Sequence, residues 1–262
     1  MSELRDCSDS ELLHLAQGVF DIPSLAAWRA AELKVLRHCA FTSPVLEIGN
    51  GCLSSLLLPR TGEGRESLYR RVACRDACRL RFADGVFATV FANCVLEHLP
   101  DLNRVLAESR RVLRAGGCLI ATVPLNLIER HLWLRTTWYA KWRAGQLQHR
   151  HLLEENAWID ALRQVGFASV QATPFLSASL CELWDRVDAP LSVGAGPLTV
   201  GRAYRMGWRF LPASGQSRLN LKWQRYFVKA LQANPSERPC AVLFQAWAPP
   251  PAADAATPQS AT

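Results

Sequence analysis

The sequence of 262 residues contains no long hydrophobic run. Its longest apolar stretches, residues 54–59 and 240–249, are far shorter than the roughly 18–20 residues that a membrane-spanning helix needs. The first 21 residues lack a basic start followed by an apolar run, which argues against a secretory signal. With 49% hydrophobic and 20% charged residues, the sequence therefore predicts a globular, cytoplasmic protein.

The cysteines lack any spacing that is typical of a metal site. Nine are scattered along the chain, and they form no Cys-x-x-Cys pair and no zinc motif with spaced histidines. An odd number without a repeating framework is typical of reduced thiols in a reducing compartment. The sequence thus predicts buried free cysteines and no metal site.

Acidic residues are missing from one long segment. Between residues 189 and 236 there is no Asp or Glu, whereas seven Arg and Lys residues there equal the whole net charge of +7. Such a basic segment indicates an anionic partner without identifying it. The seven residues are Arg202, Arg205, Arg209, Arg218, Lys222, Arg225 and Lys229.

Residues 218–232, from Arg218 to Gln232, place apolar side chains on one side of a predicted basic helix. Two interpretations stay open. The helix lies on an anionic membrane surface, at the inner face of the membrane, or it packs its apolar side on the domain and leaves its charges in solvent. Nucleic acid is not an expected partner, because the aromatic residues are not spaced as a stacking platform.

Hydrophobic periodicity changes several times along the chain. Residues 8–40 show helical spacing, and after them short apolar runs alternate with amphipathic helical stretches. This alternation predicts an α/β fold, a doubly wound and mainly parallel sheet with helices on both faces. The predicted strands are 45–48, 86–92, 118–123, 168–173 and 240–248, and the predicted core helices are 102–113 and 153–165.

Two stretches, 125–150 and 174–239, fall outside this alternation. Loops of this length in a compact domain usually carry function, so we interpret them as a helical cap over the carboxyl edge of the sheet, where open α/β sheets bind ligands. The predicted organisation is an N-terminal helical extension (1–43), an α/β core (44–124), a cap insertion (125–150), a core helix and strand (151–173), a basic helical cap insertion (174–239), a last core strand (240–248) and a disordered tail (249–262).

A glycine turn, Glu47-Ile-Gly-Asn-Gly51, follows the first predicted strand. Glycines there let the backbone approach a ligand, and the next helix offers free N–H groups. A nicotinamide-binding loop would have a third glycine at position 54, which is Ser54. The carboxylate two residues before Gly49 suits a cationic cofactor better.

Three further motifs follow along the chain. Residues 76–87 read D-A-C-R-L-R-F-A-D-G-V-F, residues 95–98 read V-L-E-H, and residues 111–117 read R-V-L-R-A-G-G before a strand that ends at Pro124. Together they resemble the widespread bacterial "methyltransferase type 11" family of class I S-adenosylmethionine-dependent methyltransferases. The resemblance is strong over residues 45–124 and looser as far as residue 167. It implies a Rossmann-like sheet of the seven-stranded type, S-adenosylmethionine as cofactor, and methyl transfer to a small-molecule acceptor.

The resemblance also implies which residues contact the cofactor. The glycine turn lies against the methionine part, with Glu47 near its amino group, and Asp76 bonds the adenine with the Ala77 backbone beside it. The Asn93 backbone lies near the sulfonium. The implied cofactor-binding set is Glu47, Gly49, Asn50, Gly51, Asp76, Ala77 and Asn93.

The segment after the glycine turn departs from the family. Leu53 stands where members have a third glycine, and residues 52–75 are too few for two helices and a strand. The family's ribose-binding acid has no clear counterpart, with Glu63 and Glu66 as the candidates. These departures support an alternative function, a degenerate methyltransferase-like protein that acts as a binding or scaffold partner in a biosynthetic complex.

Histidines supply the candidate catalytic residues. A hydroxyl acceptor benefits from a base, and a His with a pKa near 7 suits that role. His98 lies in the V-L-E-H motif, whereas His149 and His151 precede a helix near the predicted cap; a structural role is the alternative for each. The predicted acceptor is a hydroxyl of a sugar, lipid-linked saccharide or secondary metabolite. No oligomeric state is predicted.

Overall fold

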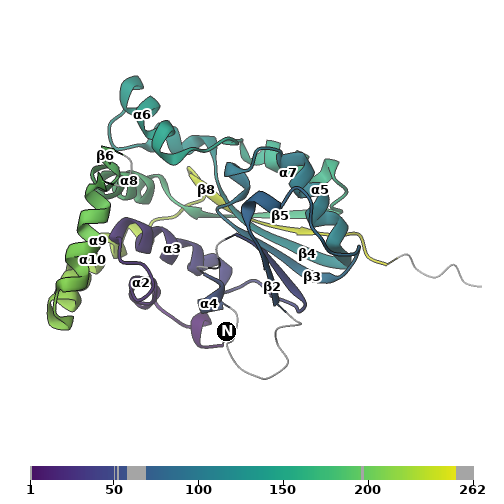
Figure 1. The fold of residues 1–262 in the computed structure, drawn as a ribbon, viewed down its shortest axis with the longest axis horizontal. Coiled ribbons are helices and arrows are strands. Elements are labelled where there is room, and N and C mark those ends of the chain that lie inside the picture. The colour runs from purple at the N-terminus through teal and green to yellow at the C-terminus, as the bar shows by residue number, and fades with distance from the viewer. Residues whose placement is uncertain (1, 50, 52, 58–68, 196–197, 252–262) are drawn as a thin grey trace, which may run out of the picture.

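The computed structural model describes residues 2–49, 51, 53–57, 69–195 and 198–251. Within them, a six-stranded sheet runs through the molecule in the order β2-β1-β3-β4-β8-β5 (Figure 1). Five of these strands run parallel, and β8 is antiparallel to both of its neighbours. The strands are β1 (Val45–Ile48), β2 (Tyr69–Val72), β3 (Phe87–Asn93), β4 (Leu113–Pro124), β5 (Ser169–Leu176) and β8 (Ala241–Trp247).

The strand order reverses next to β1. From β1 the chain passes to β2 on one side and then crosses to β3 on the other side. At such a switch point the carboxyl ends of the two strands open a crevice, which is where open α/β sheets bind ligands. The glycine turn follows β1 at this point, and the V-L-E-H motif follows β3.

The connection between β1 and β2 is short. In the described residues it contains one helix of four residues, α4 (Ser54–Leu57). β2 pairs directly with β1 and leads into a 3-10 turn at Cys74–Asp76. The described sheet therefore has six strands instead of the seven of the predicted type. Residues 58–68, with Glu63 and Glu66, lie outside the described residues.

Two hydrophobic clusters cover the two faces of the sheet, because alternate strand residues point to opposite sides. On one face Phe91 and Leu243 pack with the N-terminal helices. On the other face Val90 and Phe244 pack with α5 (Leu102–Val112) and α7 (Glu155–Gln164). The predicted doubly wound α/β fold is thus confirmed.

The N-terminal extension consists of α1 (Ser2–Arg5), α2 (Asp9–Gln17) and α3 (Pro23–Leu36). Ser8 caps α2. Its hydroxyl accepts from the Glu11 backbone N–H at 3.3 Å, and the Glu11 carboxylate accepts from the Ser8 backbone N–H at 2.6 Å. α3 begins at Pro23, since proline suits the first helical turn.

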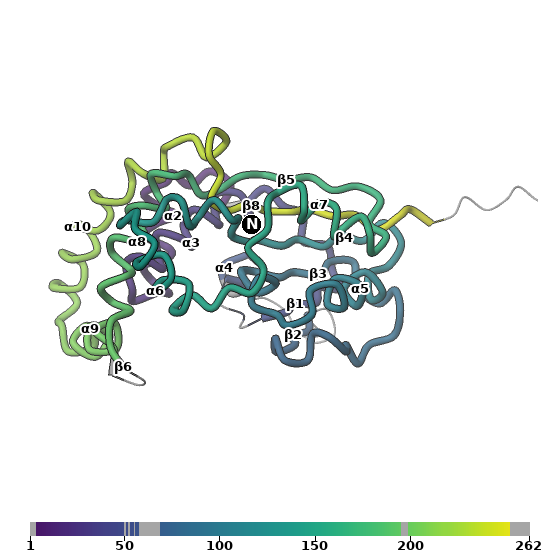
Figure 2. The backbone as a smooth tube through the Cα atoms, turned by 90° about the horizontal axis from the view of Figure 1, so that it is seen from above, coloured from purple at the N-terminus to yellow at the C-terminus, as the bar shows by residue number. Residues whose placement is uncertain are grey.

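The two insertions are largely helical and lie at one end of the molecule (Figures 1 and 2). α8 contacts α3 and the 3-10 segment, and α10 contacts α2, α3 and α8, so the cap and the N-terminal extension form one continuous packed layer. The elements are a 3-10 segment (Asn126–His131), α6 (Thr137–Leu147), α8 (Ala178–Ser192), β6 (Gly194–Ala195), β7 (Leu198–Thr199), α9 (Val200–Phe210) and α10 (Ala213–Leu231).

α10 contains the predicted basic helix, and the burial of its side chains shows how far it packs on the domain. Phe227 and Leu231 are buried, whereas Leu221 and Tyr226 are exposed. The helix therefore packs one apolar side on the domain and also exposes large apolar side chains among its charges. Among the described residues, no helix is both long and apolar enough to span a bilayer.

Candidate functional site

The glycine turn after β1 has a backbone that glycine adopts readily and other residues rarely do. Gly49 has a φ of 141° and Gly51 a φ of 76°. An added Cβ would meet the Val95 side chain at 3.1 Å from Gly49, and the Arg71 guanidinium from Gly51. Asn50 lies outside the described residues. The turn therefore brings bare main chain to the switch point.

Glu47 is buried in β1 beneath the turn. Its carboxylate accepts a short hydrogen bond from the Tyr69 hydroxyl, which also lies 3.2 Å from the Ser54 hydroxyl. Burial, followed by the bond to Glu47, raises the pKa of Tyr69 to about 12. Glu47 thus ties β1 to β2 and α4, and its contact with a cofactor amino group stays a prediction.

Asp76 and Ala77 lie on the other side of the turn, after β2. The Asp76 side chain is 59% exposed and pairs loosely with Arg75, at 3.6 Å. Ala77 is fully buried, so it fixes the position of this segment on the domain. The Asp76 carboxylate therefore stands at the surface, where a ligand can reach it.

A buried polar network lies over the carboxyl ends of β3 and β4. Arg29 of α3 donates to the Glu32 carboxylate at 2.5 Å and to Asn93 Oδ1 at 2.9 Å. Glu32, fully buried, also accepts from the Cys94 thiol at 2.9 Å and from the Thr122 hydroxyl at 3.1 Å. The Asn93 amide in turn donates to Thr122 at 2.7 Å. The N-terminal helix thus supplies a charged pair to the switch point.

Arg29 and Glu32 were not among the site residues predicted from the sequence. The signal for them is the placement of two charged residues, three apart, within an alanine-rich helix whose other residues are mostly buried. Charges on such a face need partners, because burying an unpaired charge is costly. Arg29 Nε is buried without a hydrogen-bond partner among the described residues.

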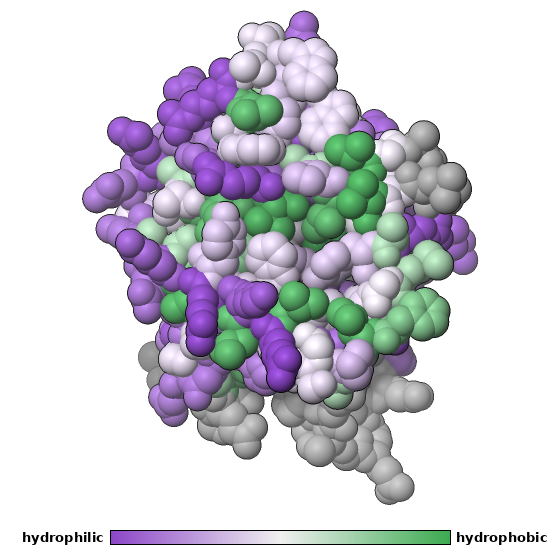
Figure 3. Space-filling view, turned by 90° about the vertical axis from the view of Figure 1, so that its left-hand side faces the viewer, coloured by the Kyte–Doolittle hydropathy of each residue, from purple (hydrophilic) through white to green (hydrophobic). Residues whose placement is uncertain are grey.

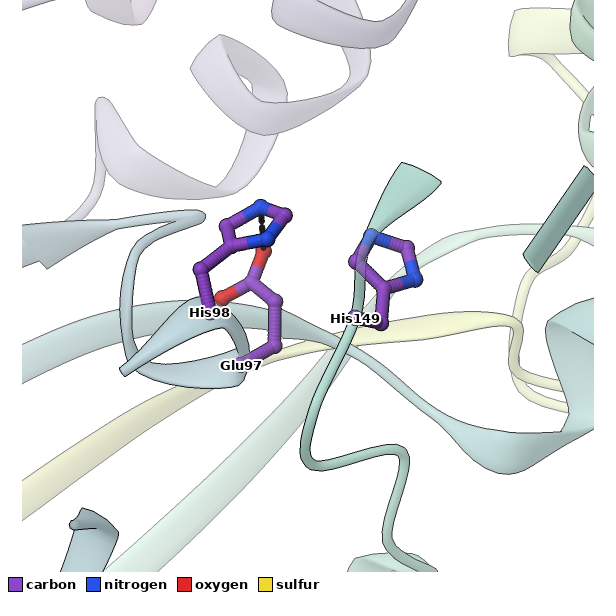
Figure 4. Close-up of side chains that lie close together, drawn as sticks. All are labelled: Glu97, His98 and His149. Carbon is purple, nitrogen blue, oxygen red and sulfur yellow. Dashed lines mark ion pairs between the residues drawn. The ribbon is translucent and has the colours of Figure 1, made fainter. Parts of the chain in front are cut away.

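Glu97, His98 and His149 form a second group at the same edge (Figure 4). Glu97 and His98 follow β3, whereas His149 follows α6 and faces them from a separate segment. Glu97 Oε1 lies 3.7 Å from His98 Nε2, and the two imidazole rings are 5.0 Å apart. Burial raises the pKa of Glu97 to about 8, and burial, with a smaller effect of His98, lowers the pKa of His149 to about 4.

His151, the third predicted catalytic histidine, has a different environment. Its ring Nε2 bonds the Leu99 carbonyl at 2.8 Å, and its backbone N–H donates to the Glu97 carbonyl at 3.0 Å. Both contacts attach the segment after α6 to the V-L-E-H motif. The ring is thus engaged with main chain beside the cluster of Glu97, His98 and His149.

A small cavity of about 40 Å³ adjoins His149. The cap provides its walls, including Ile128, Leu132 and the buried Arg143. The cavity therefore lies between His149 and the interior of the cap.

Residues 56–121 match a protein family described as "Methyltransferase domain". The matched residues include β2, β3, α5 and most of β4, with the motifs that begin at Asp76 and Val95. The chain carries a methyltransferase domain. The match begins after Gly51, so the glycine turn of this methyltransferase lies outside it.

Solved structures of other methyltransferases share the fold. A possible histamine N-methyltransferase from Thermotoga maritima is 15% identical, with a TM-score of 0.51, over 91% of this chain and 97% of that one. Phosphoethanolamine N-methyltransferase 2 from Haemonchus contortus, solved with phosphomonomethylethanolamine and S-adenosylhomocysteine, is 15% identical, with a TM-score of 0.50, over 94% of this chain and 60% of that one. No curated protein matches the sequence. The domain match confirms the predicted methyltransferase, and the shared fold is the one expected of class I S-adenosylmethionine-dependent members.

In this methyltransferase the predicted cofactor residues approach one edge of the sheet from three places. Gly49 and Gly51 follow β1, Asp76 follows β2, and Asn93 ends β3. His98 and His149 meet beside them. Among the described residues, the arrangement combines a bare glycine turn, a buried cation and a group of proton-accepting side chains.

Proposed function

We propose that this protein methylates a hydroxyl group of a small molecule, namely a sugar, a lipid-linked saccharide or a secondary metabolite. The observation that carries the proposal is the convergence of the Arg29–Glu32 network and the Glu97–His98–His149 cluster on the carboxyl edge of the sheet. The network provides a place for a charged cofactor. The cluster provides carboxylate and imidazole groups for an oxygen nucleophile.

The chain's own residues fit S-adenosylmethionine. The unpartnered buried Nε of Arg29 suits a carboxylate, and the positive φ of Gly49 and Gly51 allows close approach of a ligand to the main chain. Arg71, whose side chain is exposed, lies against Gly51. Asp76 is positioned to accept from the adenine amino group. When bound, the cofactor supplies an electrophilic methyl group on sulfur.

For such a displacement, a protein contributes mainly by holding the acceptor close to the methyl group. The Glu97, His98 and His149 side chains come from two segments, and one ligand atom from each lies within 4.8 Å of the others. The cap above them, with its cavity beside His149, provides the enclosing surface. We assign acceptor binding to this cluster, and His151 supports it through the Glu97 carbonyl.

Transfer of a labelled methyl group tests the proposed function. Purified full-length protein is incubated with methyl-labelled S-adenosylmethionine and a panel of sugar, lipid-linked saccharide and phenolic acceptors. We expect labelled product with at least one hydroxyl acceptor and its loss in Asp76→Ala, with Asp160→Ala, at an exposed carboxylate of α7, as the matched control. Equal activity of Asp76→Ala and the control would contradict the assigned adenine site.

A specific observation also favours a second candidate function, a scaffold that no longer methylates. β2 ends at Val72, and the next two residues are Ala73 and Cys74. No acidic residue therefore stands at the end of this strand to bind a ribose. In addition, Arg71 covers Gly51. Under this alternative, the protein binds neither S-adenosylmethionine nor S-adenosylhomocysteine, and co-purification with a biosynthetic enzyme replaces catalysis as the expected result.

The end of the molecule made by α9 and α10 suits peripheral attachment to an anionic membrane surface. Hydrophobic side chains lie there between strongly hydrophilic ones (Figure 3). Phe210, where α9 ends, is 85% exposed, and Met206, Leu221 and Tyr226 are exposed as well. Together with the seven cations of residues 189–236, these side chains resemble an interfacial anchor. A lipid-linked acceptor would lie at such a surface.

Vesicle sedimentation tests this attachment. We expect binding to vesicles of phosphatidylglycerol and phosphatidylcholine at low salt, weakening as salt rises because the contribution of the cations is screened. No binding at low salt would remove the membrane from the proposed function and leave the methyl-transfer proposal intact.

A further inference from the structure

The Glu97, His98 and His149 side chains are the ligand types that divalent transition metals prefer. One ligand atom from each lies within 4.8 Å of the others (Figure 4). The 3.7 Å between Glu97 Oε1 and His98 Nε2 is close to the separation of about 3.4 Å expected for two ligands on a tetrahedral ion, with bonds of about 2.1 Å. Small side-chain movements therefore suffice to bring all three to one ion.

Main-chain contacts hold the two segments of the cluster together. The Glu97 carbonyl accepts from the backbone N–H groups of Arg150 at 2.7 Å and His151 at 3.0 Å. Gln148, which ends α6, has a φ of 53°, a conformation that is uncommon for a residue other than glycine. This backbone directs the Gln148 carbonyl to His98 Nδ1, at 3.2 Å.

The contact with Gln148 fixes the tautomer of His98. A carbonyl oxygen only accepts, so Nδ1 carries the proton and Nε2 of the neutral ring presents a lone pair. Histidines that bind metals generally donate their other N–H to a carbonyl or carboxylate in this way. In His98 the lone pair of Nε2 faces the Glu97 carboxyl group.

Two further polar atoms of the cluster are buried. Glu97 Oε2 and His149 Nδ1 have no hydrogen-bond partner within the part of the chain that the structure describes. Glu97 is 1% exposed, and a buried carboxylate oxygen without a partner is costly. Glu97 is buried and His149 partly buried, so a metal ion bound between these facing groups would satisfy polar atoms that the described residues leave without a partner.

We propose that Glu97, His98 and His149 bind a divalent first-row transition metal ion, such as zinc or manganese. Two imidazoles and one carboxylate leave open positions on the ion, as catalytic metal sites do. The sequence predicted no metal site because Glu97 and His98 are adjacent, whereas His149 lies far along the chain and joins them only in the fold. We assign the acceptor hydroxyl to an open position on the ion. This assignment rests on the proposed function, whereas metal binding itself does not depend on it.

Calorimetric titration of the full-length protein with zinc and with cobalt(II), in the absence of cofactor and acceptor, tests the site. We expect one ion per chain and visible cobalt absorption bands of a coordinated site. Binding should weaken at least about a hundredfold in Glu97→Gln and in His149→Gln, since loss of a direct ligand exceeds the tenfold to hundredfold cost of an outer partner. His38→Gln, at an exposed histidine, is the matched control and should bind like the wild type.

A circular dichroism spectrum and thermal melt accompany each variant, and His98→Asn provides a third test if one variant does not fold. Metal should raise the melting temperature of the wild type and not of the ligand variants. No binding by the folded wild type, or binding that all three ligand variants retain, would overturn the proposal and leave an ordinary Glu97–His98 ion pair. Because these assays omit cofactor and acceptor, their failure is distinguishable from failure of the proposed function.

Discussion

Replacement of Arg143 by methionine is expected to destabilise the protein strongly, because it breaks a fully buried ion pair. Arg143 and Asp185 are both 0% exposed. The guanidinium donates to Asp185 Oδ1 at 2.6 Å, Asp188 Oδ2 at 3.0 Å and the Ser192 hydroxyl at 3.3 Å. These bonds join α6 to α8, so they hold the two cap insertions together.

The contacts of Asp185 set the expected loss in the free energy of unfolding. Removing one partner of a buried pair costs about 3–5 kcal/mol, since the other charge stays buried without compensation. Asp185 keeps two donors after the substitution, the Trp133 backbone N–H at 2.8 Å and the Tyr139 hydroxyl at 2.6 Å. We therefore expect a loss near the lower limit, about 3 kcal/mol in the free energy of unfolding.

A double-mutant cycle with Asp185→Asn separates the pair from the rest of the site. Asparagine keeps an oxygen for Trp133 and Tyr139 but carries no charge, so Arg143→Met/Asp185→Asn leaves no unpaired charge at these two positions. Urea unfolding, followed by circular dichroism, should give a double variant that is less destabilised than the sum of the single variants by about 1–3 kcal/mol. A single-variant loss below about 1 kcal/mol, or simple additivity, would refute this reasoning.

Three other predictions concern single positions. Ser8→Ala should lower the free energy of unfolding by about 1 kcal/mol through loss of the helix cap, and an unchanged urea midpoint would contradict the cap. Gly201→Ala should cost about 1–3 kcal/mol in a thermal or urea melt, because its Cβ would lie 2.8 Å from the Leu191 carbonyl oxygen, whereas Gly207→Ala, with open space, should not destabilise. Phe210→Asp should weaken sedimentation with anionic vesicles without altering the melting temperature, and unchanged sedimentation would argue against the α9–α10 surface as the anchor.

The core of the fold was predictable because its strands are short apolar runs between turn residues. The strands at Val45–Ile48 and Ala241–Trp247 lie within one residue of their predicted limits. β4 starts at Leu113, five residues before the predicted start, because Leu113 pairs with Phe87 across an irregularity in the register. That pairing is tertiary, and no pattern within residues 113–117 indicates it.

The candidate site was predictable only in part, for the same physical reason. Gly49, Gly51 and Asn93 follow or end parallel strands, so the fold class alone brings them to one edge. Arg29 reaches Asn93 at the end of β3 because α3 packs against β5 and β8, and a helix's own sequence does not specify where it docks. His149 meets His98 through the turn at Gln148, which has no signature in its residue type.

Calorimetric titration with S-adenosylhomocysteine tests the central claim most directly, namely that the α3 network and the glycine turn form the cofactor site. Wild-type protein is compared with Arg29→Lys, which keeps the charge beside Glu32 but lacks the Nε–H donor, and with the surface control Arg163→Lys on α7. We predict saturable binding to the wild type and the control, and clearly weaker binding to Arg29→Lys. Wild-type protein that binds no S-adenosylhomocysteine, or a folded Arg29→Lys that binds as the wild type does, would contradict the account.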